Sequence, residues 1–140
     1  MGLKLGTEEI KCIGLFESLT GAKIIDCIME DDKLVFVVDG KDVGLAIGKR
    51  GTNIKKMSEL SGKKIEIIEY SDSPEQFIRN MLRSVKIRSV QIIEKNNKKI
   101  ATIDIAKEDK GLVIGKSGKN IKRIKSLLNR HHNIMDVQIT

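Results

Sequence analysis

Residues 42–56, DVGLAIGKRGTNIKK, align without gaps on residues 109–123, DKGLVIGKSGKNIKR. Ten of the fifteen positions are identical, at a constant offset of 67 residues. A match of this length and identity within 140 residues indicates an internal duplication. We therefore interpret the chain as two copies of one unit, residues 1–71 and residues 72–140, with almost no residues left for a linker.

Each copy begins with a predicted helix. Thr7, followed by two glutamates, starts the first helix, whose apolar residues recur at helical spacing, and Gly21 is placed to end it. In the second copy Ser73 is a predicted N-cap, Pro74 occupies the first helical position, and Gln76 completes a capping box. The same element therefore opens both copies.

Runs rich in β-branched residues predict three strands in each copy, at residues 22–30, 34–38 and 63–70, and at 85–95, 100–105 and 134–140. Turn residues separate the first two strands, at residues 31–32 and 96–97. Apolar residues at helical spacing follow the repeated stretch, and Gly62 is a plausible C-cap. We expect an α+β protein made of two tandem α-β-β-α-α-β units, each a small three-stranded sheet covered by helices.

The composition excludes several classes of protein. Hydrophobic residues make up 40% of the chain and charged residues 32%, as in soluble globular proteins. No apolar run approaches the roughly 20 residues of a transmembrane helix. Residues 1–6 also lack the apolar stretch of a signal peptide. We expect a cytoplasmic protein with no membrane partner.

The residues that usually carry chemistry are sparse. Cys12 and Cys27 are too far apart for a Cys-x-x-Cys pair, and no ligand set surrounds His131 and His132. No Ser/His/Asp set, carboxylate pair or activated cysteine stands out. We expect no metal, no cofactor and no enzymatic activity.

The charge is uneven. The net charge is +7, but residues 1–70 hold 11 basic and 12 acidic residues, whereas residues 71–140 hold 15 and 7. A basic half suggests a polyanionic partner, with nucleic acid first among the candidates. The four aromatic residues, Phe16, Phe36, Phe77 and Tyr70, are few for a protein that stacks bases on exposed rings.

The repeated stretch contains two turns, Gly48-Lys49-Arg50-Gly51 and Gly115-Lys116-Ser117-Gly118, each between predicted helices. Glycine allows a close approach of another backbone, and the helix that follows presents free N–H groups and the positive end of its dipole. A lysine in the turn adds a full charge. These features indicate a phosphate-binding turn; a structural glycine turn on a solvated helix flank is the alternative.

A mononucleotide phosphate-binding loop is disfavoured. Its pattern, G-x-x-x-x-G-K-[ST], needs four residues between the glycines, but only three separate Gly111 from Gly115. The first copy also has Arg50 where that loop needs a hydroxyl for magnesium.

The segment I-G-x-x-G between two helices, within an α-β-β-α-α-β unit, resembles the KH domain in its type II arrangement. Both copies fit, at residues 47–51 and 114–118, and each is followed by Asn and Ile at fixed offsets. Two abutting domains of this kind in so short a chain look like the archaeal NusA-like transcription factors. The resemblance covers nearly the whole chain.

This resemblance implies binding of single-stranded RNA, whose backbone the GxxG turn of a KH domain holds. The positions that match the motif, and are therefore expected to bind RNA, are Ile47, Gly48, Lys49, Arg50, Gly51, Asn53 and Lys55, and Ile114, Gly115, Lys116, Ser117, Gly118, Asn120 and Lys122. The isoleucines at 47, 54, 114 and 121 would form an apolar floor under the bases, or else belong to the core. The two asparagines either contact RNA or cap a helix.

We therefore expect a non-enzymatic, RNA-binding factor in transcription elongation or termination. RNA polymerase or a nascent-transcript complex is a further candidate partner. The alternative is an adaptor that uses the KH fold mainly to dock on protein, for instance on RNA polymerase, through the near-neutral first half. The charge asymmetry adds the hypothesis that the second unit supplies most of the electrostatic affinity for RNA.

Overall fold

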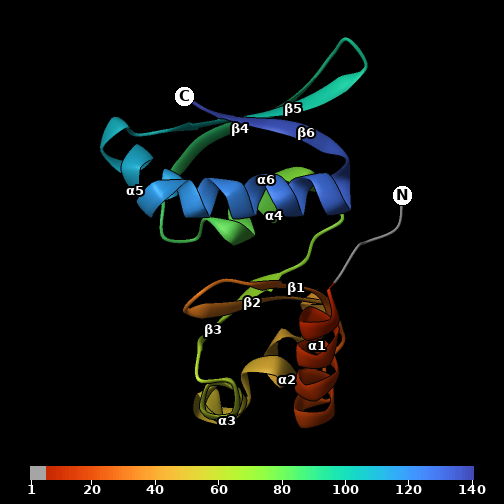
Figure 1. Cartoon of the computed structure of the whole chain (residues 1–140). Coiled ribbons are helices and arrows are strands. Elements are labelled where there is room, and N and C mark those ends of the chain that lie inside the picture. The colour runs from red at the N-terminus through yellow and green to blue at the C-terminus, as the bar shows by residue number, and fades with distance from the viewer. Residues whose placement is uncertain (1–5) are drawn as a thin grey trace. The chain divides into compact units, whose positions relative to one another are not determined.

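The computed structural model describes residues 6–140 and divides the chain into two compact units, Met1–Ser71 and Asp72–Thr140 (Figure 1). Most of the N-terminal segment on which the signal-peptide argument rests lies outside the described residues. None of the helices within residues 6–140 has the length and apolar composition to cross a membrane.

The two units have the same order of elements. The first contains α1 (Thr7–Thr20), β1 (Ile24–Met29), β2 (Lys33–Val38), α2 (Val43–Ile47), α3 (Thr52–Ser61) and β3 (Lys64–Glu69). The second contains α4 (Pro74–Met81), β4 (Ile87–Lys95), β5 (Lys98–Ile105), α5 (Lys110–Ile114), α6 (Lys119–His132) and β6 (Ile134–Ile139). Short 3₁₀ turns precede and follow α2 and α5, at Gly40–Asp42, Lys49–Gly51, Lys107–Asp109 and Lys116–Gly118. The α+β class and the α-β-β-α-α-β order of both units are confirmed.

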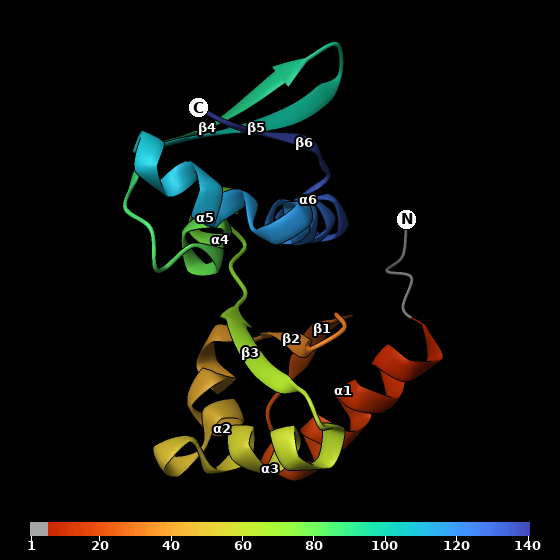
Figure 2. The same ribbon diagram turned by 60° about the vertical axis from the view of Figure 1, so that its left-hand side comes forward.

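Each unit contains one three-stranded sheet with a mixed pairing. The middle strand, β2 or β5, is antiparallel to the strand before it and parallel to the last strand of the unit. Leu34 to Val38 of β2 are all buried, as expected for a central strand rich in β-branched residues. The helices of each unit lie against its sheet, with α1 on β1 and α6 on β6 (Figure 2).

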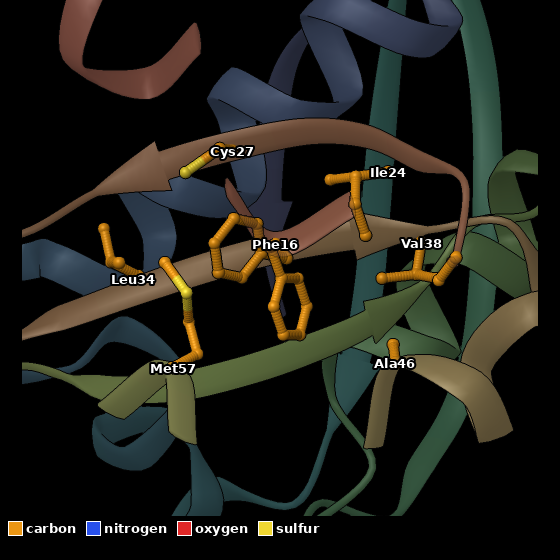
Figure 3. Close-up of a cluster of buried hydrophobic side chains, with 9 residues drawn as sticks. Phe16, Ile24, Cys27, Leu34, Val38, Ala46 and Met57 are labelled. Carbon is orange, nitrogen blue, oxygen red and sulfur yellow. The ribbon is translucent and has the colours of Figure 1, made fainter. Parts of the chain in front are cut away.

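Phe16 of α1 is the centre of the first core. It is fully buried and stacks on Phe36 of β2, with 4.4 Å between ring centroids. Met57 of α3, Leu34 of β2 and Ala46 of α2 complete the contact between helices and sheet (Figure 3). The first core therefore joins all three helices of its unit to the middle strand.

The second unit also buries a phenylalanine. Phe77 of α4 is fully buried beside α6, where its ring lies 6.0 Å from that of His131 and 5.5 Å from that of His132. This histidine pair therefore packs on a core ring.

Helix ends follow the predicted caps. Gly21 and Gly62 have the left-handed conformation that ends α1 and α3, and Ser73 Oγ accepts the Gln76 N–H at 3.2 Å. The second copy has Asn129 at the position equivalent to Gly62, so α6 continues for another turn and ends at the left-handed Asn133. This is why α6 has 14 residues and α3 has 10.

Replacement of Phe16 by alanine tests the first core. We expect Phe16→Ala to lower the free energy of unfolding of the first unit by about 3–5 kcal/mol, because it removes a buried ring and its stacking contact with Phe36. Urea denaturation of the full chain followed by circular dichroism measures the change. Leu15→Ala, on the exposed side of the same helix, is the control, with an expected change below about 0.5 kcal/mol. Equal losses would contradict the burial of Phe16.

Candidate nucleic-acid interface

Both Gly-Lys-x-Gly turns lie in the connection between two parallel strands. A parallel pair cannot be joined by a tight hairpin and needs a crossover, which is formed by α2 and α3 in the first unit and by α5 and α6 in the second. The turn is the junction of the two crossover helices. Because α2 and α3 both pack against β3, the first turn is held from both sides.

The backbone of the turn requires glycine. Gly48 has φ 78° and ψ 167°, and Gly115 has φ 79° and ψ 170°, a region that is almost restricted to glycine. A Cβ at Gly48 would also lie 2.9 Å from the backbone nitrogen of Asn53, and one at Gly115 would lie 2.9 Å from Cγ of Asn120. Conformation and close contact therefore both select glycine here.

The third residue of each turn is left-handed although it is not glycine. Arg50 has φ 58° and ψ 29°, and Ser117 has φ 56° and ψ 25°. The fourth residues, Gly51 and Gly118, are left-handed too, and their N–H groups close the turn on the carbonyls of Gly48 and Gly115 at 3.1 Å. The two turns therefore have the same shape.

An asparagine amide ties the two crossover helices together. Asn53 Nδ2, in the first turn of α3, donates to the carbonyl of Leu45 in α2 at 2.8 Å, and Asn120 Nδ2 donates to the carbonyl of Leu112 at 3.1 Å. Carbonyls in the last turn of a helix lack an intrahelical donor, so this bond satisfies one of them. The structure therefore gives both asparagines a positioning role across the turn, an interaction between helices that the sequence pattern did not reveal.

The cations around the turns are exposed. Lys49, Arg50 and Lys55 in the first unit, and Lys116 and Lys122 in the second, all point to solvent, and none of them forms an ion pair with another residue of the described part of the chain. Neither α3 nor α6 has a side-chain cap or an acidic residue in its first turn. Positive charge and the positive helix end therefore coincide at each turn.

Lys125 of α6 differs from these cations. Its Nζ lies 3.3 Å from Oδ1 of Asp136 in β6. The backbone N–H of Val137 and the Lys125 ammonium hold the pKa of the Asp136 carboxyl below its usual value. Lys125, unlike the cations at the turns, therefore already has an anionic partner.

None of the four isoleucines proposed as a floor for bases is buried. Ile114 is 41% exposed, and the isoleucines at 47, 54 and 121 are partly exposed. The buried residues of the two short helices are Ala46 and Val113.

Two further apolar residues beside the turns, Leu45 and Leu112, are 52% and 56% exposed, and sequence reasoning did not single them out. The sequence does contain a signal for these two leucines: a leucine precedes the buried residue of the short helix, Ala46 in α2 or Val113 in α5, in both copies.

The topology around the second turn differs from that of a mononucleotide phosphate loop. The turn at 115–118 follows a helix, whereas a mononucleotide phosphate loop follows a strand. Residues 6–140 contain no group of three or more metal-ligating side chains. Each turn with its flanking helix ends, residues 45–55 or 112–122, thus forms one exposed surface that is cationic and partly apolar.

Comparison with known proteins places this geometry in a family. The family model described as the NusA-like second KH domain matches twice, at residues 14–73 and 74–140. A relative from Methanocaldococcus jannaschii, named probable transcription termination protein NusA, is 39% identical over 98% of this chain and 75% of its own length. A protein of the same name from Halobacterium salinarum is 34% identical over the full length of both chains.

A solved structure titled "Crystal structure of APE1850" superimposes with a TM-score of 0.80 at 37% identity, covering 97% of this chain and 100% of that one. Family model, relatives and fold agree over both units. The chain therefore belongs to the NusA-like family of proteins with tandem type II KH domains.

Proposed function

We propose that the protein is a single-stranded RNA-binding factor of transcription elongation or termination, which holds the RNA backbone with two glycine turns. The observation that carries this proposal is that one strained, uncapped and cationic turn is built twice, at residues 48–51 and 115–118, with the same backbone angles. The names of two relatives, both probable transcription termination proteins, support transcription as the process in which this protein acts.

Each group in the surface has a role in this proposal. The exposed side chains of Lys49 and Lys116, with Arg50 and Ser117, lie against phosphates, while the flanking glycines let the RNA backbone approach closely. The uncapped N-termini of α3 and α6 add partial positive charge. The exposed leucines and isoleucines beside each turn provide apolar surface for bases.

Lys55 and Lys122 extend the positive charge along the second crossover helix. Both are exposed one turn after the glycine turn. Asn53 and Asn120 are assigned a positioning role, because one amide N–H of each donates to a leucine carbonyl and so fixes the side chain across the turn.

The alternative function is that of an adaptor that docks on another protein. Some of the acidic residues expected to face that protein already form hydrogen bonds within the first unit. The near-neutral first half, with Asp31, Asp32, Asp39 and Asp42, is the side expected to face a protein. Of these, Asp42 accepts the backbone N–H of Lys23 at 2.8 Å, and Asp39 accepts that of Lys41 at 3.3 Å. These two carboxylates therefore stabilise the segment before α2. RNA polymerase stays a candidate partner, and RNA binding by the isolated protein separates the two functions.

Charge reversal in the turns tests the contact with phosphate. We expect Lys49→Asp with Arg50→Asp, and Lys116→Asp with Ser117→Asp, each to lower affinity for a mixed-sequence single-stranded RNA at least tenfold, with the larger loss in the second unit. The second unit is the more basic, since residues 71–140 hold 15 basic and 7 acidic residues, whereas residues 1–70 hold 11 and 12. Aspartate tolerates the left-handed conformation required at 50 and 117. Fluorescence anisotropy measures the affinity.

The control for this experiment is Lys11→Asp with Lys23→Asp, which reverses two exposed charges away from the turns and is expected to change affinity less than twofold. Unchanged RNA affinity in both turn variants would refute the proposed function. An equal or larger loss at the first turn would refute only the ranking of the two units.

The salt dependence of RNA binding counts the phosphates contacted. Five unpaired cations predict a slope of the logarithm of the association constant on the logarithm of salt concentration of about −3.5, because each single-strand contact contributes about −0.7. Titration in increasing potassium chloride gives this slope, and each turn variant should make it shallower. A slope near zero would mean that the lysines do not reach the RNA backbone.

Replacement of Asn53 tests whether this residue positions the glycine turn or contacts RNA directly. We expect Asn53→Ala to destabilise the first unit by about 1 kcal/mol, because the bond to the Leu45 carbonyl is lost, and to weaken RNA binding as well. Thermal unfolding and anisotropy are measured on the same samples. Lys55→Ala is the matched variant, since it should weaken RNA binding without changing stability. An Asn53→Ala protein of unchanged stability but weaker RNA binding would instead indicate direct contact.

A further inference from the structure

The hairpin of the second unit is longer and more exposed than that of the first. Strands β4 and β5 have nine and eight residues, against six in each of β1 and β2. Every residue from 91 to 99 is exposed. In Figures 1 and 2 the turn of this hairpin extends beyond the helices of its own unit. We refer to residues 91–100 as the arm.

The arm is not covered by a helix, because α4, which packs on β4, is shorter than α1, which packs on β1. Helix α1 has 14 residues, whereas α4 has eight and ends at Met81. Two isoleucines of the arm are therefore exposed to solvent, Ile92 by 38% and Ile93 by 46%. They point to opposite faces, since Ile92 pairs with the buried Ala101 and Ile93 pairs with Ile100. Exposed apolar side chains on both faces do not contribute to the core of the unit.

The hairpin that contains the arm has a net charge opposite in sign to that of the first unit's hairpin. Residues 87–105 carry four basic and two acidic side chains, whereas residues 24–38 carry one and four. Lys95 and Lys98 are directly paired beside the turn, so two ammonium groups lie on the same face of the hairpin. Like charges in directly opposed positions destabilise a strand pair, and an anion bound between them would relieve the repulsion.

The backbone of the arm also has a free edge. Strand order in the second sheet is β4-β5-β6, so β4 has a partner on one side only within the described residues. An edge strand of this length can accept a further strand. A second copy of this chain is disfavoured as that strand, because its own arm holds three lysines and one glutamate and so carries the same net positive charge.

We propose that the arm docks an extended segment of another protein, which adds to β4 as a further strand. The segment carries apolar residues that pack on Ile92 and Ile93 and carboxylates that meet Lys95 and Lys98. Strand addition uses the edge backbone, the exposed isoleucines and the positive charge together. RNA would use the lysines, but it offers no regularly spaced N–H and C=O groups to pair with a strand edge. The arm lies outside both glycine turns, so this proposal stands independently of RNA binding.

Peptide titration of the full-length protein, followed by amide shifts in ¹⁵N NMR spectra, tests the proposal. The probe is a capped peptide, Glu-Glu-Val-Ile-Val-Thr. We expect it to shift the amide signals of residues 90–95 and to leave those of residues 48–51 and 115–118 in place. A peptide with lysines in place of the glutamates, and a peptide with proline in place of the central isoleucine, should each bind at least tenfold more weakly.

Protein variants locate the site. Lys95→Glu with Lys98→Glu, and separately Ile92→Thr with Ile93→Thr, should each weaken binding of the acidic peptide at least tenfold. The control, Lys11→Glu with Lys23→Glu, changes the net charge by the same amount and should alter binding less than twofold. None of these changes touches a glycine turn, so RNA affinity reports separately on the proposed function.

Three results would overturn the proposal. One is that the acidic peptide leaves the arm signals unchanged. Another is that it binds equally well to the protein with Lys95→Glu and Lys98→Glu. The third is that a mixed-sequence RNA shifts the arm amides while the peptide does not, which would assign the arm to the RNA surface.

Discussion

The hydrogen bond from an asparagine amide to a leucine carbonyl is the constraint on which both turns depend. It joins the first turn of α3 to α2 through Asn53 and Leu45, and the first turn of α6 to α5 through Asn120 and Leu112. With the helix ends held this closely, a side chain at Gly48 or Gly115 would collide with the asparagine. Glycine is therefore required at both positions by the close asparagine as well as by the positive φ. The two residues inside each turn, at 49–50 and 116–117, are exposed to solvent.

The duplication explains why so much of the fold could be predicted. Helix caps at Gly21, Gly62 and Ser73 are local signals, and strands rich in β-branched residues are local as well, so their positions followed from the sequence to within a few residues. The second copy repeated the order of the elements, although it has Asn129 in place of the Gly62 cap. Exposure is different, because it depends on what covers a residue from elsewhere in the chain. Periodicity alone therefore could not show that Leu45 and Leu112 are half-exposed, or that the isoleucines of the arm are exposed to solvent.

Two differences between the copies, in and beside the turn, fall at exposed positions. At the third position of the turn Arg50 is replaced by Ser117, and at the first position of the next helix Thr52 is replaced by Lys119. The Thr52 hydroxyl donates to the Lys49 carbonyl, so the first copy has a local hydrogen bond where the second has another cation. The frame of glycines and asparagine is thus common to both copies, while the charge that each turn presents has diverged.

The left-handed conformation of Arg50 shows how the frame and the charge are related. A residue with a Cβ in this conformation costs roughly 1 kcal/mol relative to glycine. The turn stays in this shape because Gly51 closes it on the Gly48 carbonyl and Asn53 holds α2 against α3. Glycine at position 50 would relieve the strain but would remove a guanidinium beside the uncapped helix end. Ser117, strained in the same way but uncharged, lies in a segment that has Lys116 and Lys119 on either side. The strain is thus common to both turns whether or not the residue is charged, which identifies the shape of the turn as the constraint and its charge as the property that is free to vary.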